Sequence, residues 1–434
     1  MTATGPGTPT GPGAAAGPGA ATAPGTASVT GLLGEIADVG RDARRGGYSR
    51  HGFSPVEGEL RTWFAEQAQR RGLDVTTDRN GNQWAWWGRP GPDAVLTGSH
   101  LDSVPGGGAF DGPLGVAAAL AAVDQLRAGG FTPRRPLALL VFTEEEGGRF
   151  GVPCLGSRLM SGSLGADAAR RLTDRDGVTL AEAALDAGLD PARFGRDDAA
   201  LAQVGCFVEL HVEQGRLLDR LPGTPSVAVA SSILAHGRWR FTLTGTGNHA
   251  GTTEVADRRD PMLPAAAAVL AARRALGGRP DARATVGRLE PTPGGTNVIA
   301  SSVDFWLDAR APADAEVRAV VEEITEAARD AAAEEGCELT VRQESFGDTV
   351  LFDAGLRDRL AAELGGPGAP VPVLPTGAGH DAGILAARVP TAMLFVRNPT
   401  GISHAPAEHA EPADCEAGGR ALATVLESLA GGGS

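Results

Sequence analysis

The 434-residue sequence contains no lysine, so all 39 basic residues are arginine. This absence excludes Schiff-base chemistry, which needs a lysine amine, and the lysine-dependent phosphate loop of nucleotide-binding proteins. It also excludes Ser–Lys and Cys–Lys–Glu amidases, and any metal pair bridged by a carbamylated lysine. Hydrolytic chemistry in this chain must therefore use other side chains.

Cysteines and long apolar runs are also scarce. The four cysteines are scattered and form no CxxC pair, which indicates free thiols in a reducing compartment. Nothing resembles a signal peptide or a membrane span, so we expect a cytoplasmic protein with no membrane partner. The net charge of −14 and the lack of a basic stripe argue against a nucleic-acid partner.

Composition and periodicity divide the chain into three parts. Residues 1–27 carry no charge and consist almost entirely of Gly, Ala, Pro and Thr, which predicts a disordered tail. In 28–232 and 348–434, strand and helix patterns alternate, which predicts an α/β catalytic domain with a mainly parallel, helix-covered sheet. Residues 233–347 follow the order β-α-β-β-α-β of the ferredoxin-like arrangement, so we expect an inserted lid or dimerisation domain.

The stretch VLTGSHLDSVPGGGAFDGPLGV (95–116) leads from a strand through a glycine-rich loop into a helix with Pro113 in its first turn. The loop contains His100, Asp102 and Asp111. An imidazole and two carboxylates this close together suit zinc or another divalent metal. On this stretch alone, Asp102 as a turn residue and Asp111 as a helix cap are equally open interpretations.

Three further polar positions follow predicted strands. They are the triplet Glu144-Glu145-Glu146, His211 and His404. Because the carboxyl ends of parallel strands meet at one edge of a sheet, we expect them to lie near His100. The triplet could be a solvated loop, but repulsion among adjacent carboxylates favours a nearby cation.

Several short motifs follow one another in a characteristic order. They are GSHLDSVPGGGAFDGPLG, EEEGGRF, ELHVEQG, GNHAGTT with a following RRD, GGTNVI, LDAR, GAGHDA and GISHAPAE. From about residue 28 to residue 425 the chain resembles the M20 peptidase-like amidohydrolases. Within them it is most similar to the branch of allantoate amidohydrolase and N-carbamoyl-L-amino acid hydrolase, which includes β-ureidopropionase.

The resemblance implies two divalent metal ions per subunit, with zinc expected first and manganese or cobalt as alternatives. His100 and His211 would bind one ion, Glu146 and His404 would bind the other, and Asp111 would bridge the two.

The same resemblance assigns catalytic roles. Glu145, just before the metal-binding glutamate, would be the general base that accepts a proton from the attacking water and delivers it to the leaving nitrogen. Asp102 would hold the imidazole of His100 in the required tautomer. Glu144 is left as an extra acid without a catalytic role. A cis peptide bond is expected between Asp111 and Gly112.

Substrate-binding groups are implied on both domains. His249 (GNHAG) and Asn297 (GGTN) would donate to the developing oxyanion, and Arg310 (LDAR) would grip a substrate carboxylate. By residue type alone, without the resemblance, a core histidine, a turn asparagine and a surface ion pair are the favoured interpretations of these three. Gln214 and His380 are assigned to substrate binding. In a homodimer formed through the inserted domain, the lid groups would serve the metals of the other chain.

These assignments predict an enzyme that hydrolyses the ureido C–N bond of a small carboxylate. Allantoate is the first choice, giving ureidoglycine, ammonia and carbon dioxide, because WAWWG and FVRNPTGISHAPAEH resemble segments of allantoate amidohydrolases. An N-carbamoyl-L-amino acid hydrolase or β-ureidopropionase is the alternative, followed by an M20 aminopeptidase. A non-catalytic binding protein on the same scaffold is disfavoured, because all five ligands and Glu145 are present.

Overall fold

A computed structural model of the chain describes residues 1, 27–365 and 368–431. The tail expected over 1–27 falls almost entirely outside these residues. Among the described helices, none is long and apolar enough to span a membrane.

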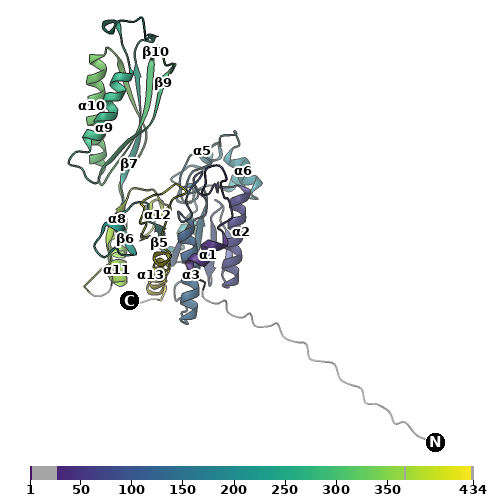
Figure 1. The fold of residues 1–434 in the computed structure, drawn as a ribbon. Coiled ribbons are helices and arrows are strands. Elements are labelled where there is room, and N and C mark those ends of the chain that lie inside the picture. The colour runs from purple at the N-terminus through teal and green to yellow at the C-terminus, as the bar shows by residue number, and fades with distance from the viewer. Residues whose placement is uncertain (2–26, 366–367, 432–434) are drawn as a thin grey trace.

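A nine-stranded sheet forms the larger part of the molecule (Figure 1). Its central strands β4, β3, β5 and β15 are parallel, and the strands toward both edges pair mostly antiparallel. The order is β1 (Asp74–Thr77), β2 (Gln83–Trp87), β4 (Leu137–Phe142), β3 (Ala94–His100), β5 (Val204–Val212), β15 (Thr391–Val396), β6 (Val227–Ile233) and β13 (Val350–Leu351), with β14 (Val373–Thr376) also pairing with β6.

Helices cover both faces of this sheet. Every residue of β3, β4 and β15 is buried, as expected for near-continuous apolar strands packed on two sides. One face packs against α1 (Val29–Glu35), α2 (Pro55–Arg70), α3 (Pro113–Ala128) and α13 (Pro412–Ala430). The other packs against α4 (Leu155–Ser161), α7 (Asp198–Leu201), α8 (Leu217–Arg220) and α12 (Asp381–Leu385). The predicted α/β fold with a parallel centre is confirmed.

Short elements complete this part of the chain. The segment after α4 contains α5 (Ala166–Arg170), α6 (Leu180–Asp186) and the 3-10 turn Pro191–Arg193. Helices α5 and α6 share a small apolar cluster with α4, Phe53 and Phe150. Helix α11 (Ala354–Gly365) packs near β6 and α13.

A second, four-stranded antiparallel sheet projects from the first (Figure 1). It runs β12 (Glu338–Gly347), β7 (Ala235–Thr244), β11 (Ser302–Ala311) and β9 (Arg283–Thr292), with α9 (Met262–Ala275) and α10 (Asp314–Glu334) on one face. Along the chain the order is β7-α9-β9-β11-α10-β12. In α10, apolar residues recur every three or four positions and face the sheet.

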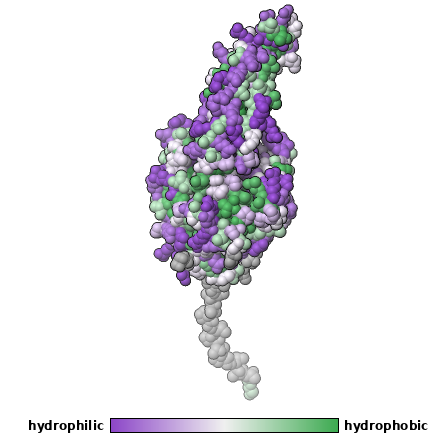
Figure 2. Space-filling view, turned by 90° about the vertical axis from the view of Figure 1, so that its left-hand side faces the viewer, coloured by the Kyte–Doolittle hydropathy of each residue, from purple (hydrophilic) through white to green (hydrophobic). Residues whose placement is uncertain are grey.

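The projecting unit ends in a small ribbon. There β8 (Asn248–His249) pairs with β10 (Val298–Ile299), near the 3-10 turn Val255–Asp257. Figure 1 places β10 at the end of the unit farthest from the large sheet. Figure 2 shows the unit as a narrow extension of a wider body, with both hydrophilic and apolar side chains on its surface.

Candidate metal centre

The strands of the large sheet deliver the polar residues of the site to one edge. His100 is the last residue of β3 and His211 is the second-last of β5. Glu144 to Glu146 follow β4, and His404 lies in the loop after β15. Asp111 lies two residues before α3. The expected convergence at the carboxyl ends of parallel strands therefore occurs.

Asp111 lies between two groups of potential ligands. Its Oδ1 is 3.4 Å from Nε2 of His100 and 3.2 Å from Nε2 of His211. Its Oδ2 is 3.4 Å from Nε2 of His404, which in turn is 3.4 Å from Oε2 of Glu146. The five residues thus form two groups that could each hold a metal ion and that share Asp111.

The donor atoms fit a cation. Nδ1 of His100 lies 3.1 Å from the carbonyl of Asp102, and Nδ1 of His211 lies 2.9 Å from the carbonyl of Val212. A carbonyl only accepts, so both Nδ1 atoms carry a proton, and in the neutral ring each Nε2 atom presents a lone pair to a cation. These two Nε2 atoms are buried without a hydrogen-bond partner, as expected of nitrogen atoms that bind a metal ion.

The charges of the cluster also call for a cation. Burial raises the pKa of Glu146 to about 8, and it raises the pKa of Glu145 well above its ordinary value. The hydrogen bond with Asp111 raises the pKa of His404 to about 9. Carboxylates crowded and buried in this way repel one another unless positive charge lies between them.

Asp102 acts on two neighbours through different atoms. Its main-chain carbonyl orients His100, whereas its carboxylate lies 3.5 Å from that ring. The two carboxylate oxygens accept the main-chain N–H groups of Glu145 and Glu146, at 3.1 and 3.0 Å. The side chain therefore fixes the glutamate pair, and the imidazole is oriented by the main chain.

The three consecutive glutamates point in different directions. Glu146 joins the metal ligands, and Oε2 of Glu145 lies 3.6 Å from Nε2 of His100. Glu144, with φ +50°, turns away and is fully buried. Its carboxylate accepts the main-chain N–H groups of Gly52, Arg149 and Phe150 at 2.8–3.0 Å. Glu144 therefore anchors the loop that carries the other two.

Sequence reasoning missed two residues that hold Asp111. The Ser403 hydroxyl, which has one proton to donate, lies 3.1 Å from Oδ2 of Asp111 and 3.2 Å from Oε1 of Glu408. Glu408 also accepts the N–H of Asp111. Both lie in the GISHAPAE motif around His404, so an unassigned carboxylate four residues after a ligand was the available signal.

Gln214 and His380 both lie beside the cluster. Nε2 of Gln214 donates to Oδ2 of Asp111 at 2.6 Å. The ring of His380 packs 4.5 Å from the ring of His211, and neither of its nitrogens has a partner. His380 is 2 % exposed, and burial holds its pKa well below the ordinary value, so this imidazole is neutral.

The residues expected on the lid lie at opposite ends of the projecting unit. His249 pairs with Val298 across the β8–β10 ribbon, and the carbonyl of Asn297 accepts from Ala250. Both are exposed at the end far from the large sheet (Figure 1). Within one chain they are not brought to the metal cluster.

Arg310 lies at the other end, near the base of the unit. It pairs with both oxygens of Asp308 and donates to the carbonyl of Gly377, three residues before His380. Arg310 therefore contacts the segment of its own chain that leads to His380.

The prediction of a cis peptide bond between Asp111 and Gly112 is wrong. Among the described residues, Thr292–Pro293 is the one cis bond. Gly112 instead turns the chain with φ +84°, and a Cβ there would lie 2.5 Å from the His100 ring. Glycine is required at this position by both backbone conformation and space.

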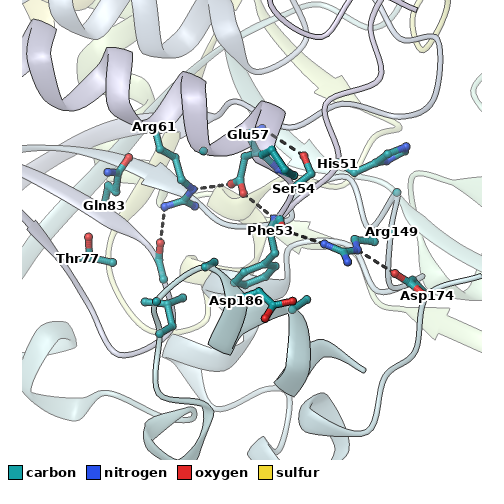
Figure 3. Close-up of a pocket in the computed structure, with 18 of the residues that line it drawn as sticks. His51, Phe53, Ser54, Glu57, Arg61, Thr77, Gln83, Arg149, Asp174 and Asp186 are labelled. Atoms are coloured by element: carbon teal, nitrogen blue, oxygen red, sulfur yellow. Dashed lines mark hydrogen bonds and ion pairs between the residues drawn. The ribbon is translucent and has the colours of Figure 1, made fainter. Parts of the chain in front are cut away.

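A cavity of about 960 Å³ is lined by residues that include His51, Phe53, Arg61 and Arg149 (Figure 3). None of the five ligands lines it. Four of its charged side chains form ion pairs, Arg61 with Glu57 and Arg149 with Asp174. This cavity is therefore separate from the metal centre.

Comparison with known proteins places this arrangement in a family. Residues 96–428 match the model of peptidase family M20/M25/M40. The chain is 38% identical to N-carbamoyl-L-amino acid amidohydrolase of Geobacillus stearothermophilus over 92% of this chain and 97% of that one. It is 32% identical to allantoate amidohydrolase of Bacillus subtilis, over 83% of this chain and 87% of that one. Its structure resembles that of a hydantoinase/carbamoylase family amidase of Burkholderia multivorans, with a TM-score of 0.83, 31% identity and 94% and 98% of the two chains covered. As its motif order predicts, the chain belongs to the M20/M25/M40 peptidase family.

Proposed function

We propose that this chain is a two-metal amidohydrolase that cleaves the ureido C–N bond of a small substrate carrying a carboxylate. The observation that carries the proposal is the shared Asp111, which joins the His100–His211 and Glu146–His404 pairs, with the Glu145 carboxylate beside them. These residues would hold two divalent ions, zinc first and manganese or cobalt as alternatives. Once bound, such ions lower the pKa of water and polarise a carbonyl.

Glu145 is the proton carrier in this proposal. Its carboxylate faces the cluster, and burial raises its pKa well above the ordinary value, which favours acceptance of a proton from water near neutral pH. The same oxygen then delivers the proton to the departing ureido nitrogen. Asp102 keeps Glu145 in place through its N–H group.

Other side chains of the cleft would recognise the substrate. Gln214 offers an amide next to Asp111, and His380 offers an unpartnered neutral imidazole. Arg310 presents a planar fork that suits a carboxylate. His249 and Asn297 lie too far out to act in their own chain, so we infer that they donate to the oxyanion in a second chain.

The projecting unit offers a surface for such a homodimer. Leu263, Val269 and Leu270 of α9 and Leu289 of the edge strand β9 are 37–60 % exposed, and α9 lies over β9. A two-fold axis beside β9 would bury this apolar edge. It would also bring the far end of one unit beside the base of the other.

Two substrates merit direct comparison. The 38% identical relative acts on N-carbamoyl-L-amino acids by its name, and we place this class first. Allantoate, expected from the WAWWG and FVRNPTGISHAPAEH segments, comes second. Both combine a ureido group with a carboxylate. The four free cysteines fit a cytoplasmic enzyme.

Ammonia release from the metal-loaded full-length chain tests the proposal. N-carbamoyl-L-amino acids, allantoate and N-carbamoyl-β-alanine are compared, with a simple dipeptide as the aminopeptidase control. We expect ammonia from at least one ureido acid, loss of activity with a chelator and recovery with zinc, manganese or cobalt. Turnover of the dipeptide alone, or full activity without any divalent metal, would contradict the proposal.

A further inference from the structure

The Cys154 thiol is placed against the carboxylate that we assign as the general base. Cys154 begins α4 in the left-handed conformation, with φ +54°, and is 2 % exposed. Residues other than glycine seldom adopt this conformation. The side chain does not cap the helix, so this unusual placement needs another explanation.

Both the main chain and the side chain of Cys154 contact Glu145. The Cys154 N–H donates to the carbonyl of Glu145 at 2.6 Å, and the thiol donates to Oε1 at 3.3 Å. The other oxygen, Oε2, lies 3.6 Å from Nε2 of His100 on the side of the metal ligands. The thiol therefore binds one carboxylate oxygen of Glu145 and leaves the other beside His100.

A thiol suits this task better than a strong donor. Burial raises the pKa of the Cys154 thiol well above its ordinary value, so the sulfur keeps its proton and stays a donor. An S–H group is a weak donor, which orients a carboxylate while stabilising its charge only slightly. A hydroxyl or main-chain N–H in the same place would stabilise the anion more strongly and make it a weaker base.

We propose that Cys154 is a positioning residue that holds the Glu145 carboxylate with Oε2 turned toward the metal ligands. This inference rests on the proposed role of Glu145 as the base. Cys154 takes no part in bond making or breaking.

Kinetics of two substitutions in the metal-loaded full-length enzyme test the proposal. For Cys154→Ala we expect kcat to fall about 10- to 100-fold, because misplacing a catalytic group by about 1 Å can cost about 100-fold. KM and metal content should stay at wild-type values. Cys154→Ser keeps a donor and should recover a larger share of kcat. Cys415→Ala removes another buried thiol, on α13, and should leave kcat unchanged.

Infrared spectroscopy of the S–H stretch gives a readout that a merely structural role would not move. The Cys154 band is identified as the S–H band that is absent from Cys154→Ser and from Cys154→Ala. It should shift to higher frequency in Glu145→Gln, because an amide oxygen accepts a weaker hydrogen bond than a carboxylate. If Cys154→Ala fails to fold or to bind metal, the proposal is tested by the frequency shift in Glu145→Gln and by the kcat of Cys154→Ser.

Two outcomes would overturn the proposal in distinguishable ways. Wild-type kcat in Cys154→Ala, together with an inactive Glu145→Gln, removes the role of Cys154 and leaves the proposed function intact. Wild-type kcat in Glu145→Gln removes the base itself, and the proposed mechanism with it.

Discussion

The carboxylate of Glu408 accepts the main-chain N–H of Asp111 at 3.0 Å, across 297 positions of the sequence. The same oxygen accepts the N–H of Phe110, so one buried acid fixes the loop just before the bridging carboxylate. The motif around His404 therefore controls the central ligand as well as supplying a terminal one.

Glu408→Ala should weaken metal binding. The Asp111 loop loses two hydrogen bonds, and removing groups that orient ligands typically costs about 10- to 100-fold in affinity. The check is a competition titration with a metal chelator, with Glu411→Ala, an exposed acid in the same segment, as the control. Equal affinities for the two variants would mean that Glu408 does not support the site.

Glu145→Gln and Glu146→Gln should behave differently although they are neighbours. Because Glu145 faces the cluster without belonging to either ligand group, its variant should keep its metals and lose about 100- to 10,000-fold in kcat. Glu146→Gln should first lose one of the two metal ions. Metal content by elemental analysis, read beside kcat, separates the two. The reverse pattern would show that the register of the triplet is misassigned.

The metal-free protein should lose stability as the pH rises from about 5 to about 9. Burial raises the pKa of Glu144 to about 7 and of Glu146 to about 8, and the Asp111 contact raises that of His404 to about 9. In this range the folded chain holds more protons than the unfolded chain, so unfolding becomes easier with increasing pH.

Metal binding should reverse much of that trend, because ligands bind a cation in their deprotonated state. Melting temperatures measured from pH 5 to pH 9, with chelator and with zinc, give the comparison. The stabilisation by zinc should grow with pH. A metal-free protein whose melting temperature rises over this range would contradict the assigned shifts.

Parts of this site could be predicted from sequence, and parts could not. Four of the ligands lie at or after the carboxyl ends of strands: His100, His211, Glu146 and His404. Parallel strands bring their carboxyl ends together even when the strands are far apart in the sequence. The hydrogen bonds from Glu408 to the Asp111 loop depend on how the long loop after β15 folds back. Hydrophobic periodicity in the sequence does not predict that path. The need for glycine at position 112 likewise follows from local packing around His100.

The placement of Arg310 could not be derived from its motif. The LDAR motif predicts that Arg310 lies on a strand. Which end of the projecting unit Arg310 occupies depends on the register between β11 and β7, and the motif does not give that register. Arg310 pairs with His236 at the start of β7, whereas Ser302, at the other end of β11, pairs with Thr244. The eight residue steps from Ser302 to Arg310 span about 26 Å at roughly 3.3 Å per residue, which separates Arg310 from the ribbon of His249.

That separation predicts two different results when inactive variants are mixed and reassembled. In a mixed dimer of Glu145→Ala and His249→Ala, one site receives both lesions and the other receives neither, if His249 serves the partner. With random mixing half the dimers are mixed, so activity should recover to about a quarter of wild type. Glu145→Ala mixed with Arg310→Ala should recover nothing if Arg310 serves its own chain, since every site then carries a lesion. Recovery in both mixtures would place Arg310 in the partner's site, and recovery in neither would mean that the sites are not shared.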